Sequence, residues 1–251
     1  QELNYTIDHL KEWMQPQTVS TNLVNQPSAS FVMREPLGVV CIIAPWNYPF
    51  QLLFTPLIGA IAGGNCAVLK PSEFAPATAK VMGEIIHSLF PENYIIYVEG
   101  DGATVIPPLL TENKFDHIFY TGSTVVGKII YKYAAEQLVP VTLELGGKSP
   151  AVITSDANIR VAARRIASPK YSNAGQMCIA PDYVLVPTEL KEEFIKELIR
   201  AIQSFYGENA MESEHYGKII NDKQWLRLSA YLAEGEIVYG GQTDRARLFI
   251  E

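Results

Sequence analysis

Leu37-Gly-Val-Val-Cys-Ile-Ile43 is a continuous apolar run with the length of one strand. A run without polar alternation is typical of a strand that is buried on both faces of a parallel sheet. Downstream of it, short apolar runs alternate with helical stretches, and this order predicts a doubly wound α/β domain. We expect further strands at 66–69, 94–98 and 116–120, and helices at 52–63, 76–90, 104–111 and 124–136.

The flanking regions set the expected domain boundaries. Residues 1–33 read as the end of a helix, with Leu3, Ile7, Leu10 and Met14 on one face, followed by an extended polar connection. We expect residues 34–140 to form the doubly wound domain and residues 141–251 to form an incomplete second α/β domain. In that part we expect strands at 141–145, 151–154 and 183–186, and helices at 158–167, 190–206 and 222–234. Because the chain starts within a helix and stops within an expected strand, we expect it to be part of a longer protein.

Composition excludes several classes of function. The chain has 251 residues, 48% of them apolar and 19% charged, which is the balance of a globular protein. Its net charge of −7 argues against nucleic acid as a main partner, since phosphate binding requires a surplus of Lys and Arg. The three cysteines and four histidines lack the spacing of a disulfide framework or a metal site. We therefore expect no metal, a reducing cytoplasmic compartment and no membrane-spanning helix, because the apolar stretches are too short.

One cysteine stands in a loop that could carry chemistry, Asn173-Ala-Gly-Gln-Met-Cys-Ile-Ala-Pro181. A cysteine nucleophile requires thiolate character from nearby dipoles or charges, together with enough exposure to meet its substrate. A glycine-bearing loop can supply both. The alternative is that Cys178 is a small buried apolar residue with an inert sulfur.

Two stretches could bind a ligand where strands of the expected sheet end. Thr121-Gly-Ser-Thr-Val-Val-Gly127 joins a strand to a helix, so its backbone N–H groups could attract an anion, although it lacks the three-glycine fingerprint and the P-loop pattern. Lys70 and Glu73 follow another strand and could hydrogen-bond ribose hydroxyls. The alternatives are a tight turn without a ligand and, for Lys70 and Glu73, a solvated loop pair.

Two further polar residues have positions suited to catalysis. Asn47 lies between large aromatic residues in Ala44-Pro-Trp-Asn-Tyr-Pro-Phe50, where its amide could donate to a developing oxyanion. In the strand expected at 141–145, Val141, Leu143 and Leu145 face one side and Glu144 faces the opposite side. If its face borders a cleft, desolvation would help Glu144 to take a proton from water. The alternative for Asn47 is a structural role in which its side chain hydrogen-bonds the turn. The alternative for Glu144 is the ordinary polar face of a half-buried strand.

Taken together, five stretches resemble the aldehyde dehydrogenase superfamily in the family's own order. DHIFYTGS, CIAPDYVLVP and IVYGGQTD are similar to its dimeric class 3 branch. The five stretches are PWNYPF at 45–50, NCAVLKPSE at 65–73, FYTGSTVVG at 119–127, LELGGKSP at 143–150 and NAGQMC at 173–178.

The resemblance implies NAD(P)-dependent oxidation of an aldehyde to a carboxylic acid. It implies Cys178 as nucleophile, Glu144 as general base and Asn47 as part of the oxyanion site. It also implies a dinucleotide-binding domain at 34–140, a catalytic domain at 141–251 and NAD as the cofactor, with NADP possible because class 3 enzymes often accept both. The implied cofactor contacts are Trp46, Lys70, Ser72, Glu73, Gly122, Ser123, Val126, Gly127, Leu145 and Gly146.

Three departures from the family's pattern limit what is carried over. Ser168-Pro169 and Met177 replace commoner residues near the cysteine, and no Glu-x-Phe-Gly-Pro motif is present. The family's chain is also much longer. For the full-length protein the resemblance implies a homodimer, and a membrane-anchoring tail stays an open alternative. The alternative function is a catalytically inactive fragment, or a binding or structural protein that retains the fold.

Overall fold

The structure is a computed structural model that describes residues 1–251, and it divides into two compact units, Gln1–Leu145 and Gly146–Glu251. The division falls after Leu145 rather than near residue 140, because strand β7 (Val141–Glu144) pairs with β6 (His117–Thr121) in the sheet of the first unit. Each unit is described by itself.

The first unit is built on a sheet of five parallel strands, as the apolar runs predict. Its strand order is β5-β4-β3-β6-β7, so the chain starts in the middle, at β3, and winds first to one side and then to the other. This order is that of a doubly wound α/β sheet. Besides β6 and β7, its strands are β3 (Val39–Ile43), β4 (Cys66–Lys70) and β5 (Ile95–Tyr97).

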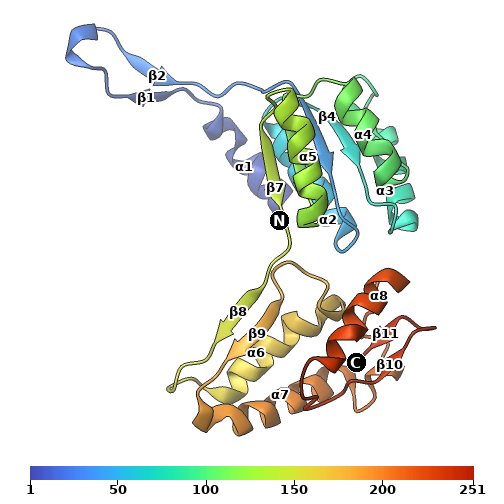
Figure 1. The fold of residues 1–251 in the computed structure, drawn as a ribbon. Coiled ribbons are helices and arrows are strands. Elements are labelled where there is room, and N and C mark those ends of the chain that lie inside the picture. The colour runs from blue at the N-terminus through green and yellow to red at the C-terminus, as the bar shows by residue number, and fades with distance from the viewer. The chain divides into compact units, whose positions relative to one another are not determined.

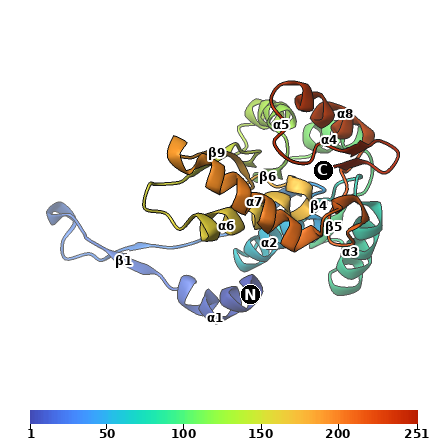
Figure 2. The same ribbon diagram turned by 90° about the horizontal axis from the view of Figure 1, so that it is seen from below.

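Helices cover both faces of this sheet. Alternate residues of β3 point to opposite sides, so Ile42 packs in one apolar cluster and Cys41 in the other. Figure 2 shows α2 and α3 on one side of the sheet and α4 and α5 on the other. Each large apolar side chain that is fully buried in this way stabilises the unit by about 1.5–3 kcal/mol. The helices are α2 (Pro49–Ala62), α3 (Pro76–Leu89), α4 (Gly102–Glu112) and α5 (Thr124–Glu136).

The segment before the sheet is more regular than an extended connection. Helix α1 (Glu2–Trp13) is followed by an antiparallel hairpin of β1 (Gln17–Val19) and β2 (Ser30–Val32), with a short helix η1 (Leu23–Asn25) between them. Figure 1 shows this hairpin projecting away from the sheet of its own unit. The helix at the start is confirmed, but most of its apolar face is exposed: Leu3, Ile7 and Met14 are exposed and Thr6 is the buried residue.

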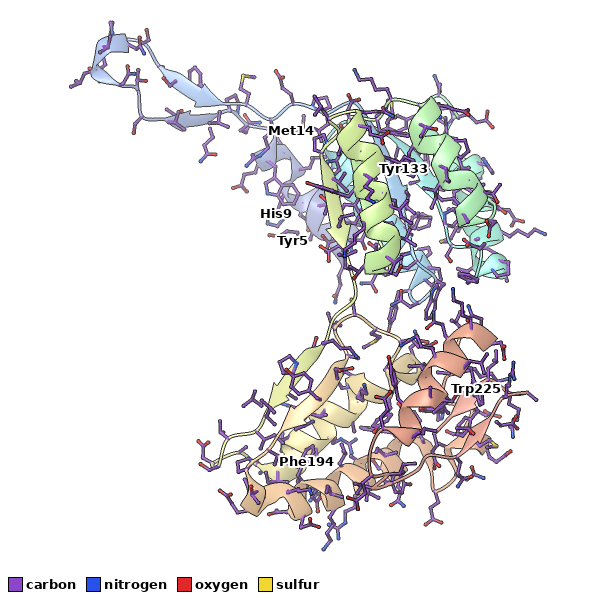
Figure 3. The ribbon with its side chains drawn as sticks, in the orientation of Figure 1. Tyr5, His9, Met14, Tyr133, Phe194 and Trp225 are labelled. Atoms are coloured by element: carbon purple, nitrogen blue, oxygen red, sulfur yellow. The ribbon has the colours of Figure 1, made fainter.

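The second unit packs two long helices against a pair of parallel strands. Strands β8 (Ser149–Val152) and β9 (Pro181–Leu185) pair in parallel, and α6 (Ile159–Tyr171) and α7 (Lys191–Tyr206) lie side by side (Figures 1 and 2). Phe194 of α7 is buried in the core of this unit (Figure 3). The remaining elements are α8 (Asp222–Ser229), β10 (Thr243–Asp244), β11 (Phe249–Ile250) and the short helices η2 (Ser172–Gly175), η3 (Thr188–Leu190), η4 (Ala210–Glu212) and η5 (Ala230–Ala233).

Two helices of the second unit differ from their expected bounds. Helix α6 continues through Pro169 to Tyr171, beyond the expected end at residue 167, and the helix expected at 222–234 is divided into α8 and η5. Trp225 of α8 (Figure 3) donates from its indole nitrogen to the carbonyl of Phe249 at 2.8 Å, which ties α8 to β11. No helix in the chain has the length and apolar character needed to cross a bilayer.

Candidate active site

Four loops of the first unit meet at one edge of its sheet. All five strands are parallel, and Ile43 lies in register with Lys70 on one side and with Tyr120 on the other. The carboxyl ends of β3, β4, β6 and β7 therefore share an edge. The neighbours β3 and β6 form the switch point of the doubly wound order, which is where open α/β sheets bind ligands. The loops at this edge carry Trp46, Asn47, Lys70, Ser72, Glu73, Gly122, Ser123, Glu144 and Leu145.

Lys70 is the most buried charged residue of this edge, with a relative exposure of 1%. Its ammonium group donates to the carbonyl of Pro71 at 2.6 Å and lies 3.6 Å from Oε2 of Glu73. Burial lowers the pKa of Lys70, and the charge of Glu73 opposes this shift. The interpretation of Lys70 and Glu73 as a solvated loop pair is therefore wrong for Lys70: a buried cation that is held in place is a preorganised donor.

Ser72 and Glu73 complete this loop. Ser72 is buried, and its hydroxyl accepts from the backbone N–H of Phe74 at 3.3 Å. Glu73 is partly exposed. Its carboxylate lies beside the first residue of α4, since a Cβ placed on Gly102 would be 3.4 Å from its Oε1. A carboxylate that is paired on one side and open to solvent on the other can accept from a ligand hydroxyl.

The turn from β6 into α5 has a local explanation for its glycines. A Cβ on Gly122 would lie 2.2 Å from the hydroxyl of Tyr120, and a Cβ on Gly127 would lie 2.8 Å from Cδ2 of Leu145. Ser123 caps the helix by accepting from the N–H of Val126 at 3.3 Å. The glycines are therefore required by packing within the unit, whereas Ser123 and Val126 are exposed at the start of α5. The first N–H groups of a helix have no partner within it and favour an anion.

The residues after β3 and β7 have different exposures. Trp46 and Asn47 are partly buried, and Pro49 occupies the first turn of α2 directly after them. Val141, Leu143 and Leu145 pack toward the core as their alternation predicts. Glu144 points the other way and is exposed.

The second unit carries Cys178, and exposure separates this residue from the other two cysteines. Cys41 is fully buried in β3, and burial raises the pKa of its thiol to about 12, so its thiolate is absent near neutral pH. Cys66 is partly buried at the first residue of β4, the opposite end of the strand from the edge formed by the carboxyl ends. Cys178 is exposed in the loop before β9. The alternative that Cys178 is a buried inert residue is therefore wrong.

Two glycines of the second unit that the sequence marks differ sharply in their surroundings. A Cβ on Gly147 would lie 2.3 Å from the backbone carbonyl oxygen of Cys178, whereas a Cβ on Gly146 would meet nothing within 4 Å. Gly147 thus lets the backbone before β8 lie directly against the cysteine. Gly147 was not among the expected site residues, although a Gly-Gly pair is typical of close backbone approach.

Charged residues flank the cysteine loop. Lys148 Nζ lies 3.2 Å from Oδ1 of Asp182. Burial lowers the pKa of Lys170, Asp182 opposes this shift and Lys148 adds to it. Nothing in the sequence marked Lys170, because its burial depends on how the loop folds back on α6.

Other sites in the described chain do not compete with this one. No group of three or more His, Cys, Asp or Glu side chains could hold a metal ion. A cavity of about 430 Å³ in the second unit lies between α7 and residues 231–239, and Cys178 does not line it. Its walls are mainly aliphatic and tyrosine side chains, with Glu236 as the charged residue among them.

Comparison with known proteins places these features in a family. The profile described as "Aldehyde dehydrogenase family" matches residues 1–249. The chain is 48% identical over 244 residues to 4,4'-diaponeurosporen-aldehyde dehydrogenase of Staphylococcus aureus (strain NCTC 8325 / PS 47), an alignment that covers 96% of this chain and 53% of that protein. It is 44% identical over 250 residues to aldehyde dehydrogenase family 3 member B3 of Mus musculus, covering 99% and 52%.

Solved structures agree with this assignment. The structure titled "Substrate bound state of Staphylococcus Aureus AldH" matches with a TM-score of 0.94 and 46% identity, covering all of this chain and 55% of that one. A Mycobacterium tuberculosis aldehyde dehydrogenase complexed with NAD+ matches with a TM-score of 0.86 and 30% identity, covering 99% and 53%. The chain spans about half the length of the relatives that it matches. By sequence and by fold, the chain belongs to the aldehyde dehydrogenase family.

Proposed function

We propose that the full-length protein oxidises an aldehyde to its carboxylic acid with NAD(P)+ as the oxidant. The observation that carries this proposal is the exposure of Cys178 on a glycine-bearing loop, while the other cysteines are buried or distant from the ligand-binding edge. Membership of the family supports it, as do the relatives named as aldehyde dehydrogenases.

In this proposal Cys178 provides the nucleophile. Its thiolate adds to the aldehyde carbonyl carbon, and the resulting oxyanion accepts hydrogen bonds from the Asn47 amide and from the backbone N–H of Cys178. NAD(P)+, when bound, supplies the acceptor for the hydride that leaves this carbon. Cys178 then carries the acyl group as a thioester. Glu144 takes a proton from water, the water attacks the thioester, and the acid is released as the thiol is restored.

The first unit has the donor set for a dinucleotide. Lys70 and Glu73 offer a fixed cation and a carboxylate for the hydroxyls of the adenosine ribose, and the exposed start of α5 at Ser123 and Val126 suits a pyrophosphate. Trp46, Ser72, Gly122, Gly127 and Leu145 lie at the same edge, and Gly146 follows it in the chain. Structures of family members in complex with NAD+ support this assignment. The negative charge of Glu73 favours NAD over NADP, because it repels a 2′-phosphate.

Three finer features belong to the proposal. The aldehyde is apolar, since Tyr48, Phe50 and Met177 flank the residues assigned to catalysis, and the similar Staphylococcus aureus protein is named for 4,4'-diaponeurosporen-aldehyde. The full-length protein is a cytoplasmic homodimer, which the class 3 resemblance and the exposed apolar residues of the hairpin support. Light scattering on the purified full-length protein tests the dimer.

The test of function uses the full-length protein with NAD+ or NADP+ and a series of medium-chain aldehydes. We expect formation of reduced cofactor and of carboxylic acid, and loss of both in Cys178→Ala with cofactor affinity retained. A native protein that binds NAD+ but forms no reduced cofactor between about pH 7 and 9 would support the alternative, a binding or structural protein that keeps the fold.

A further inference from the structure

Gln176, two residues before Cys178, links two segments of the second unit that are distant in sequence. Its side-chain nitrogen donates to the carbonyls of Asn173 and Lys218, both at 3.0 Å. Its side-chain oxygen accepts from the backbone N–H of Ile220, also at 3.0 Å. Rotating the amide by 180° would place its oxygen against two carbonyl oxygens, so the network itself fixes which way the amide points.

The turn that Gln176 holds has an unfavourable backbone conformation. Asn173, Ala174 and Gly175 have φ values of 51°, 51° and 73°, so three successive residues lie in the left-handed region. Gly175 adopts this region freely and Asn173 tolerates it, but Ala174 is disfavoured there by contact of its Cβ with the backbone. Such a conformation persists only where the surrounding structure holds it.

The segment on the far side of Gln176 is itself anchored. The backbone of Gly217 lies against the turn, since a Cβ there would be 3.3 Å from the nitrogen of Ala174. Ile219 is buried, and its N–H donates to the carbonyl of Leu248 at 2.9 Å. Residues 217–220 therefore form a fixed support on which the Gln176 side chain can hold the turn.

We propose that Gln176 is a positioning residue: it clamps the left-handed turn 173–175 to residues 217–220 and thereby fixes Cys178 for attack. This inference rests on the proposed function for the role of Cys178. Without the clamp, Ala174 relaxes toward a right-handed or extended conformation, and the residues after it move. A displacement of the nucleophile by about 1 Å is enough to lower a reaction rate substantially.

The experiment compares Gln176→Met, Ala174→Gly and the double variant in the full-length protein. Methionine matches glutamine in length but makes none of the three hydrogen bonds. Amide hydrogen exchange, followed by mass spectrometry on peptides from 173–180 and 217–220, reports on the turn without cofactor or aldehyde. We expect exchange in these peptides to accelerate by about tenfold in Gln176→Met, and kcat to fall by about tenfold with KM within about twofold.

The rescue arm separates positioning from general destabilisation. Glycine removes the cost of the left-handed conformation at residue 174. The double variant should therefore have a kcat about fivefold higher than that of Gln176→Met alone. Gln224→Met is the matched control, because the Gln224 side-chain oxygen accepts only within α8, from Arg227 at 2.8 Å. This control should leave exchange in both peptides and kcat unchanged.

Two results would overturn the clamp: unchanged exchange at 173–180 in Gln176→Met, or a fall in kcat that follows the melting temperature and is not relieved by Ala174→Gly. If the turn loosens as expected but the native protein oxidises no aldehyde, the clamp stands and the proposed function fails. Failure of the two ideas is therefore distinguishable.

Discussion

At the scale of single residues, the glycines show what a motif does and does not predict. A Cβ on Gly122 would lie 2.2 Å from the hydroxyl of Tyr120, so a side chain of the same chain takes up the space beside this glycine. A Cβ on Gly127 would lie 2.8 Å from Cδ2 of Leu145, the end of a flexible side chain. A motif therefore predicts that space is scarce at a glycine, while the neighbour that fills the space depends on contacts that are not local in sequence.

Gly147→Ala should disturb the cysteine loop directly. Its Cβ would lie 2.3 Å from the carbonyl oxygen of Cys178, and backbone atoms cannot move aside as cheaply as a flexible side chain. We expect a loss of about 1–3 kcal/mol in the free energy of unfolding, as in overpacked sites, together with a fall in kcat. Urea denaturation and steady-state kinetics measure the two effects.

Gly235→Ala is the control for this prediction. A Cβ at Gly235 would meet nothing within 4 Å, so both the free energy of unfolding and kcat should stay at the native level. If Gly147→Ala and Gly235→Ala had the same free energy of unfolding and the same kcat, Gly147 would not be in contact with the cysteine.

His117 should make stability depend on pH. Burial lowers the pKa of His117, which lies 3.0 Å from the hydroxyl of Thr142 through its Nε2. As pH falls through the unfolded value of about 6.5, the unfolded chain takes up a proton before the folded one does. This contribution to stability is therefore complete above that pH and is lost as pH falls toward the lowered folded value.

The measurement is urea denaturation of native protein and of His117→Gln between about pH 7.5 and 5. The native protein should lose more stability on acidification than the variant does. His215→Gln, which changes an exposed histidine, should keep the native pH dependence. A variant His117→Gln with the full native pH dependence would show that another group is responsible.

At the scale of elements, the apolar runs were predictable and the hairpin was not. The strands of the first unit were found within a few residues because buried parallel strands are apolar throughout. Strands β1 and β2 were missed because each has three residues and lacks alternation. Helix α6 was expected to end at residue 167, whereas it continues through Pro169 to Tyr171.

The start of α5 allows capping to be separated from anion binding. Ser123→Ala removes the acceptor for the N–H of Val126 and should cost about 0.5–2 kcal/mol in the free energy of unfolding, with little effect on NAD+ affinity. Ser123→Asp keeps a capping oxygen and suits the helix dipole, so stability should be retained. Its charge would oppose a pyrophosphate at the same place.

Calorimetric titration with NAD+ measures this opposition. We expect Ser123→Asp to raise the Kd for NAD+ by about tenfold, which corresponds to one like-charge contact of about 1.4 kcal/mol. Native affinity in Ser123→Asp would mean that the start of α5 does not receive the pyrophosphate.

At the scale of the whole molecule, the sequence predicted the doubly wound parallel sheet, whereas the first compact unit ends at Leu145 and not near residue 140. Strand β7 was assigned to the second domain because the boundary was placed near residue 140, between the stretches that could carry chemistry. Its hydrogen bonds with β6, in which Thr121 is paired with Glu144, place it in the first unit. Strand pairing between distant segments is not readable from apolar patterning alone.

This division gives the proposed mechanism its sharpest requirement. Glu144 ends the sheet of the first unit, whereas Cys178 belongs to the second. The proposal requires that both act in succession on one substrate carbon. Removing the base should therefore leave the first half of the reaction intact and block the second half, since only hydrolysis of the thioester depends on Glu144.

The most direct measurement is rapid-mixing kinetics of Glu144→Gln in the full-length protein with NAD+ and a medium-chain aldehyde. We predict a burst of about one reduced cofactor per subunit followed by very slow turnover, with the acyl group retained on Cys178 in the mass spectrum. Cys178→Ala should show no burst. Native steady-state turnover in Glu144→Gln, or a burst that leaves Cys178 unmodified, would contradict the account.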